Sequence, residues 1–135
     1  MRPFQYYMKT EVLFGADMAD RTAELVKKHG GSRVLVVYGG GSAVKSGLLD
    51  RIRGQLRDAG IVHETFGGVQ PNPRLGHARK GVELAKTMQA DLILAVGGGS
   101  VIDTAKAIAH GTANPETDIW EFWLRRAARP ATRRF

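Results

Sequence analysis

The chain of 135 residues contains no cysteine. This excludes disulfides and thiolate metal sites and is typical of a cytoplasmic protein. No apolar run approaches the roughly 20 residues that are needed to span a bilayer. The first ten residues also lack the apolar core that a signal peptide requires. We therefore expect a cytoplasmic protein with no membrane partner.

Acidic residues are absent from residues 125–135, which carry five arginines. The net charge of the chain is +7, but without these arginines the basic residues barely outnumber the 13 acidic ones. The excess positive charge therefore belongs to a tail and not to a binding face. Because no aromatic platform is interleaved with it, we expect no nucleic-acid partner. We expect residues 1–124 to form one domain and residues 125–135 to form a disordered basic tail.

Residues 91–113 combine a strand, a glycine run and a helix. Residues 92–96 are uncharged and mostly branched, which is typical of a strand buried on both faces of a parallel sheet. Three glycines, 97–99, interrupt this run, and apolar residues then recur at helical spacing. Ser100 and Asp103 form an S-x-x-D pair, which predicts that Ser100 caps the new helix.

A triple glycine between a strand and a helix is suited to holding an anion. Glycines let a phosphate approach the main chain, and the first helical turn offers free N–H groups and roughly half a positive charge. The alternative is a tight turn without a ligand. A second GGGS sequence, at 39–42, follows the apolar run 34–38. Two such loops favour a ligand with more than one phosphate or ribose, and hence a nucleotide.

The remaining periodicities predict alternating helices and strands. Helices are expected at 18–28, with Asp17 as N-cap, at 44–59 and at 73–89, and a further strand at 61–66. Residues 4–14 alternate between apolar and polar types, which predicts a hairpin or an edge strand that ends at Gly15.

This order of elements predicts an α/β fold: a Rossmann-like parallel sheet flanked by helices and preceded by an N-terminal β-hairpin. Ligands of such sheets bind beyond the carboxyl ends of the strands. The loops 39–42, 67–73 and 97–100 each follow a strand, so we expect them to surround one crevice.

Three segments resemble a known family. GGGSVIDTAKAIA (97–109) is similar to the pyrophosphate-binding signature of iron-containing (group III) alcohol dehydrogenases. YGGGS (38–42) with KSGL (45–48) resembles the NADP-dependent butanol dehydrogenase branch, and FGGVQPNP (66–73) matches its connecting loop. The resemblance covers residues 4–123 and only the N-terminal half of such an enzyme.

The resemblance implies that residues 98–100 bind a pyrophosphate and that the first GGGS loop binds the adenosine ribose. NAD-using relatives tend to have Asp where this chain has Gly39, and the chain has no acid between Val34 and Leu49. A missing carboxylate removes repulsion against a 2′-phosphate, and Lys45 adds positive charge. We therefore expect NADP in preference to NAD, against the alternative of a loop without preference.

Two further residues have alternative interpretations. Asn72 lies between two prolines and is either a turn residue or, as the resemblance implies, a cofactor contact. Asp103 is either a helix-capping carboxylate or, as the resemblance implies, an acid near the nicotinamide. The predicted cofactor-binding residues are Gly39, Gly40, Gly41, Ser42, Asn72, Gly97, Gly98, Gly99, Ser100 and Asp103.

The resemblance also implies Fe²⁺ or Zn²⁺, which one Asp and three His hold in a helical C-terminal domain of the family. The four histidines here, at 29, 63, 77 and 110, lie in different predicted elements, so we expect no metal ligand and no catalytic residue in this chain. The resemblance is expected to end at Trp123, and we interpret the sequence after it as a truncation or a frameshift.

The expected function is that of an NADP-binding domain from a metal-dependent alcohol dehydrogenase. In the full-length family, an alcohol and an aldehyde interconvert by hydride transfer. Alone, this chain is expected to bind the nicotinamide dinucleotide and to perform little chemistry. The alternative is a non-catalytic nucleotide-binding or oligomerisation module. We also expect self-association into a homo-oligomer, because a surface that normally packs on a second domain is exposed.

Overall fold

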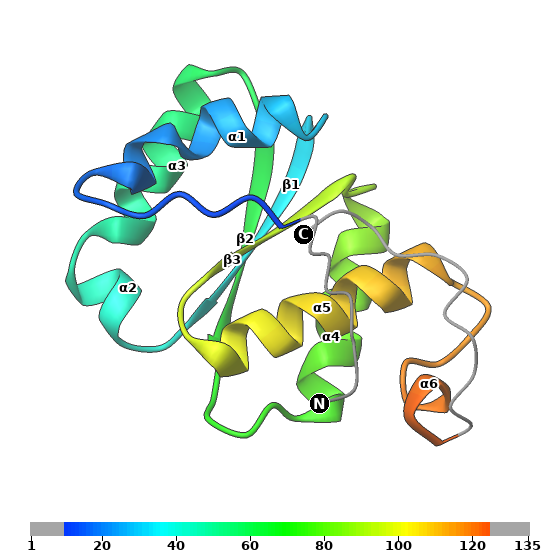
Figure 1. Ribbon diagram of the computed structural model, residues 1–135. Helices are drawn as coiled ribbons and strands as arrows, with labels where there is room; N and C mark the ends of the chain where they lie inside the picture. The colour runs from blue at the N-terminus through cyan, green and yellow to red at the C-terminus, as the bar shows by residue number, and fades with distance from the viewer. Residues whose placement is uncertain (1–9, 125–135) are drawn as a thin grey trace, which may run out of the picture.

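The computed structural model of the protein describes residues 10–124. A three-stranded parallel sheet lies between two layers of helices (Figure 1). The strands are β1 (Arg33–Gly39), β2 (Val62–Val69) and β3 (Leu92–Val96), in the order β2-β1-β3. The helices are η1 (Met18–Arg21), α1 (Thr22–Lys28), α2 (Ser42–Lys45), α3 (Leu48–Asp58), α4 (Leu75–Thr87), α5 (Gly99–Ala113) and α6 (Glu121–Leu124). The predicted α/β class with a parallel sheet is confirmed.

The central strand β1 holds the two layers together. Residues 34–37 are fully buried, and alternate side chains point to opposite faces. Val34 and Val36 pack with α1 and α3, whereas Leu35 and Val37 pack with α4 and α5. Residues 34–37 are all uncharged because helices cover both faces of the sheet at this strand.

A β-bulge extends β2 beyond its predicted end at residue 66. Val37 pairs with Phe66 and Gly39 pairs with Val69, so β2 has one more residue than β1 over this stretch. The extra length falls on Gly67 and Gly68, and Gly68 has a left-handed φ of 80°. The Tyr38 ring occupies the space that a side chain at position 67 would need. The prediction that the loop begins at residue 67 is therefore wrong.

Glycines also allow α4 and α5 to pack closely. A Cβ at Gly81 would lie 2.8 Å from Ile108 Cγ1, and one at Gly111 would lie 2.6 Å from Val82 Cγ2. These neighbours are buried in the core between the two helices and the sheet. A side chain at either glycine would push the helices apart.

Two helix predictions need correction. Residues 18–21 form the 3-10 helix η1, and Asp17 makes no capping hydrogen bond with its side chain. The predicted helix 44–59 is divided into α2 and α3 because Gly47 has a φ of 73°. As a result, Val44 is 47% exposed, and Leu49 is buried instead.

The N-terminal segment does not continue a strand in the described part of the chain. Residues 10–14 have no strand pairing, and Phe14 is 98% exposed. Residues 1–9, where the hairpin was predicted to begin, and the predicted tail 125–135 lie outside the described residues.

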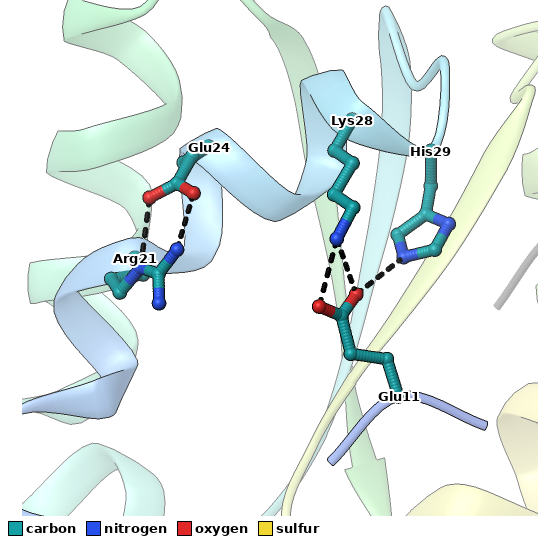
Figure 2. A network of polar contacts seen from close by, with 5 residues as sticks. All are labelled: Glu11, Arg21, Glu24, Lys28 and His29. Atoms are coloured by element: carbon teal, nitrogen blue, oxygen red, sulfur yellow. Dashed lines mark hydrogen bonds and ion pairs between the residues drawn. The ribbon is translucent and has the colours of Figure 1, made fainter. Parts of the chain in front are cut away.

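A small polar network attaches this segment to α1 (Figure 2). Lys28 Nζ donates hydrogen bonds to both Glu11 carboxylate oxygens, at 2.8 and 2.9 Å, and His29 Nε2 lies 3.8 Å from Glu11 Oε2. The hydrogen bond from Lys28 holds the pKa of the Glu11 carboxyl below its ordinary value. Because all three side chains are exposed to solvent, the network stabilises the fold only weakly.

Asp91 joins the starts of β1 and β3. Its carboxylate accepts hydrogen bonds from the N–H groups of Ser32 and Arg33, at 3.0 and 2.9 Å, and from the Ser32 hydroxyl. Burial acts to raise the pKa of Asp91, but these hydrogen bonds outweigh it, so the pKa lies below its ordinary value. The charged form of Asp91 is therefore the one that the fold stabilises.

We expect Asp91→Asn to lower the free energy of unfolding at pH 7 by about 1 kcal/mol, because charge-assisted hydrogen bonds are lost. The folded-state pKa lies below that of the unfolded chain. The contribution is therefore fully present above an ordinary pKa of about 3.9 and disappears as the pH falls through the lower folded-state value. Urea unfolding at pH 7 and at about pH 3 measures this. Asp58→Asn, at an exposed carboxylate, is the control; equal effects of the two variants would contradict the role of Asp91.

Candidate nucleotide-binding cleft

The strand order creates a crevice between β1 and β3. These strands are neighbours in the sheet, yet the helices that follow them cover opposite faces: α3 packs on one side and α5 on the other (Figure 1). The chain therefore leaves the two adjacent strands in opposite directions. In parallel α/β sheets, this switch point is where ligands bind.

A cavity of about 210 Å³ lies at this switch point. Its walls come from the loop and helix start after β1, the residues after β2 and the glycine loop with the first turn of α5. The lining residues are Gly39, Gly41, Ser42, Ala43, Val69, Gln70, Pro71, Val96, Gly97, Gly98, Gly99, Ser100 and Val101. The three loops that were predicted to surround one crevice do so.

Gly97 is required by the sharp turn out of β3. Its φ is 157°, and a Cβ at this position would lie 2.7 Å from Val101 Cγ2. Any other residue would strain the backbone and collide with the first turn of α5. The turn directs the N-terminus of α5 at the cavity.

The first turn of α5 presents free main-chain donors. The Gly98 carbonyl accepts from the N–H groups of Val101 and Ile102, at 3.0 and 3.1 Å. The N–H groups of Gly99 and Ser100 precede the helical pairing and have no acceptor within residues 10–124. A Cβ at Gly98 or Gly99 would meet open space, so a ligand can approach these donors. Such an arrangement favours a phosphate.

The Ser100 side chain does not cap α5, contrary to the sequence-based prediction. The helix begins one residue earlier, at Gly99, so the N-cap is Gly98, which has no side chain. Asp103 consequently has no capping role. The reason is that Gly99 already adopts helical geometry before the first polar side chain, which leaves Ser100 beside the cavity.

The first GGGS loop differs from the second in its electrostatics. It leads into α2, which has only four residues, so its helix dipole contributes little. Gly41 and Ser42 line the cavity, whereas Gly40 does not. An anion at this loop would depend on main-chain N–H groups, with Lys45 at the end of α2 as the cation that follows in the chain.

Two predicted residues lie away from the cavity. Asn72 is an exposed turn residue with a φ of 58° and is not part of the lining. Asp103 lines a different cavity, between α4 and α5. Val69, Gln70 and Pro71 line the cavity and belong to the 67–73 loop that was predicted to border it, but none of them was among the predicted cofactor-binding residues. Their signal was the apolar-to-polar change at 69–70, directly after the glycine pair.

The cavity lining contains no charged side chain. No carboxylate from the described part of the chain therefore opposes an anion there, and attraction comes from backbone dipoles. Within residues 10–124, no three His, Asp or Glu side chains come together at metal-binding distance. No helix in this range is long and apolar enough to cross a membrane.

Comparison with protein families matches residues 9–134 to the iron-containing alcohol dehydrogenase model. The chain belongs to the iron-containing alcohol dehydrogenase family. The match extends past Trp123, so the expected end of the resemblance at that residue is not seen in this comparison.

Among relatives in this family, some are named as NADH-dependent and others as NADPH-dependent. A probable NADH-dependent butanol dehydrogenase of Bacillus subtilis is 46% identical over 121 residues, which cover 90% of this chain and 31% of the relative. An NADPH-dependent aldehyde reductase of Escherichia coli is 36% identical over 121 residues, 89% of this chain and 30% of the relative. The chain thus spans about a third of the length of these dehydrogenases.

A solved structure agrees with the fold. The crystal structure of an NADH-dependent butanol dehydrogenase A from Thermotoga maritima matches 98% of this chain and 33% of its own, with a TM-score of 0.92 and 36% identity. The sheet and helices described above are therefore those of the N-terminal domain of iron-containing alcohol dehydrogenases.

We expect Ser100→Ala to change the free energy of unfolding by less than about 0.5 kcal/mol, because the hydroxyl caps nothing. A true N-cap serine would cost about 0.5–2 kcal/mol. Ser32→Ala is the matched control: it removes a hydrogen bond to Asp91 and should cost about 1 kcal/mol. A loss from Ser100→Ala as large as that from the control, measured by urea unfolding, would restore the capping role.

Proposed function

We propose that this chain is the NADP-binding part of an enzyme that interconverts alcohols and aldehydes. The observation that carries the proposal is the uncharged cleft at the β1–β3 switch point, with free N–H groups of α5 beside it. Family membership supports a nicotinamide dinucleotide as the ligand. When bound, the nicotinamide accepts or supplies a hydride, and the substrate and the metal are expected to bind outside this part of the protein.

The chain's own residues bind and orient the dinucleotide. The N–H groups of Gly99 and Ser100 would donate to the pyrophosphate, with the dipole of the 15-residue helix α5 adding to the attraction. Gly39, Gly41 and Ser42 would face the adenosine ribose across the cleft. Val69 and Pro71 would exclude water from its apolar wall.

The preference for NADP rests on what the first loop lacks. A dinucleotide-binding domain selective for NAD commonly places an acid after the corresponding strand, where it accepts a hydrogen bond from the ribose 2′-hydroxyl. Gly39 ends β1 here, and Lys45 has no hydrogen bond or ion pair through its side chain within residues 10–124. A 2′-phosphate would meet main-chain donors and a cation rather than a carboxylate.

Titration of the purified chain with NADPH and NADH, followed by nucleotide fluorescence, tests this function. We expect saturable NADPH binding that Gly99→Ala weakens at least tenfold, since the methyl group occupies the space of the phosphate. Gly54→Ala in α3 is the matched control, because its Cβ has only an Arg57 nitrogen nearby, at 3.9 Å.

Both substitutions place alanine in a helix and should leave the protein folded, with Gly54→Ala more stable by about 0.5–1 kcal/mol. Wild-type protein that is folded but binds neither nucleotide would overturn the proposal. A non-catalytic module would give the same binding but no alcohol oxidation when the chain is joined to the rest of a family enzyme.

We expect Gly39→Asp to weaken NADPH binding about tenfold or more while leaving NADH binding unchanged or tighter, because the carboxylate repels the 2′-phosphate and accepts from a 2′-hydroxyl. A Cβ at Gly39 meets its neighbours at 3.4 Å or more, so the fold tolerates it. Lys45→Gln should weaken NADPH binding alone by a few-fold. If Gly39→Asp weakens the binding of NADPH and of NADH equally, the cleft does not distinguish the two nucleotides at the ribose 2′ position.

A further inference from the structure

A second, larger cavity of about 690 Å³ lies between the start of α4, one face of α5 and the segment before α6. Its lining consists of Pro73, Arg74, Leu75, Ala78, Asp103, Thr104, Lys106, Ala107, His110, Ile119 and Trp120. None of these residues lines the nucleotide cleft. The volume is that of a typical small-molecule site.

Three charged side chains at this cavity have no partner among residues 10–124. Arg74, Asp103 and Lys106 make no hydrogen bond or ion pair through their side chains with any part of the chain that the structure describes. Asp103 and Lys106 are one helical turn apart on α5, and Arg74 precedes α4. These three residues, the charged edge of the cavity, comprise two cations and one carboxylate. Their net positive charge favours an anion.

Part of the lining, the apolar wall, consists of Leu75, Ile119 and Trp120, and Trp120 is 45% exposed. Asp118 fixes this segment by accepting two hydrogen bonds from Arg79 of α4, both at 2.8 Å, and one from the Trp120 N–H at 2.9 Å. The hydrogen bonds from Arg79 and then from Trp120 hold the pKa of Asp118 below its ordinary value, so the clamp is charged at neutral pH.

We propose that this cavity binds a small organic anion, whose charged head lies beside Arg74 and Lys106 and whose apolar body lies against Leu75, Ile119 and Trp120. An inorganic ion would leave the apolar wall unused, and a neutral apolar molecule would leave both cations unpaired. This site is separate from the nucleotide cleft, so the proposal does not depend on the proposed function.

Calorimetric titration with three probes of the same chain length tests the chemistry: hexanoate, hexyl phosphate and 1-hexanol. We expect hexanoate or hexyl phosphate to bind saturably and at least tenfold more tightly than 1-hexanol, with an affinity that falls as salt is added. The better of the two anions identifies the head group as a carboxylate or a phosphate. Amide and indole shifts in an NMR titration should be centred on Ala107, Ile119 and Trp120.

Removing a cation and removing the carboxylate should change the affinity for the anionic probe in opposite directions. We expect Arg74→Gln and Lys106→Gln each to weaken binding of the anionic probe about three- to tenfold, and Asp103→Asn to tighten it about two- to fivefold. Lys80→Gln, at an exposed lysine of α4 outside the cavity, is the control and should change nothing. Binding of 1-hexanol should be the same in all four variants.

Four results would overturn the proposal. Equal affinity for 1-hexanol and the anions would make the cavity an apolar groove without anion recognition. Shifts centred on Gly98 and Ser100 would assign the probes to the nucleotide cleft. The absence of saturable binding, or equal effects of Lys106→Gln and Lys80→Gln, would leave the charged edge without a ligand role.

Discussion

The cleft exists because β1 and β3 pair side by side while the helices that follow them lie on opposite faces of the sheet. This arrangement depends on β1, where four consecutive residues, 34–37, are buried from both sides. A polar side chain at any of them would lack a partner in one of the two cores. The position of the free N–H groups at α5 is thus a consequence of how the centre of the sheet is packed.

The two cavities differ in the groups that line them. The lining of the cleft has no charged side chain, so attraction for an anion would come from the main chain there. In the second cavity, long and exposed side chains supply the charge, and the Arg79–Asp118 pair positions the apolar wall. The first kind of site is preorganised by the fold, whereas the second is sensitive to salt and to single substitutions.

Sequence patterns predicted the features that depend on local chemistry. Buried runs predicted β1 and β3, and the two GGGS sequences predicted loops that meet at one crevice. The patterns were wrong where backbone conformation was decided by neighbours in space. Strand β2 continues through Gly67, where the Tyr38 ring occupies the space that a side chain would need, and Gly47 divides a helix that apolar spacing alone had predicted to be continuous. The capping motif at Ser100 was wrong because Gly99 enters the helix first, which makes Gly98 the N-cap.

By itself, the sequence determined the alternation of strands and helices and the placement of glycine loops after two strands, because periodicity and the lack of a Cβ act within a few residues. Only the tertiary structure decided that β3 lies next to β1, that Val69, Gln70 and Pro71 are the residues of the 67–73 loop that line the cleft, and that Asp103 belongs to another cavity. These outcomes depend on strand order and on which face each helix covers. Both are settled by the burial of side chains far apart in the chain.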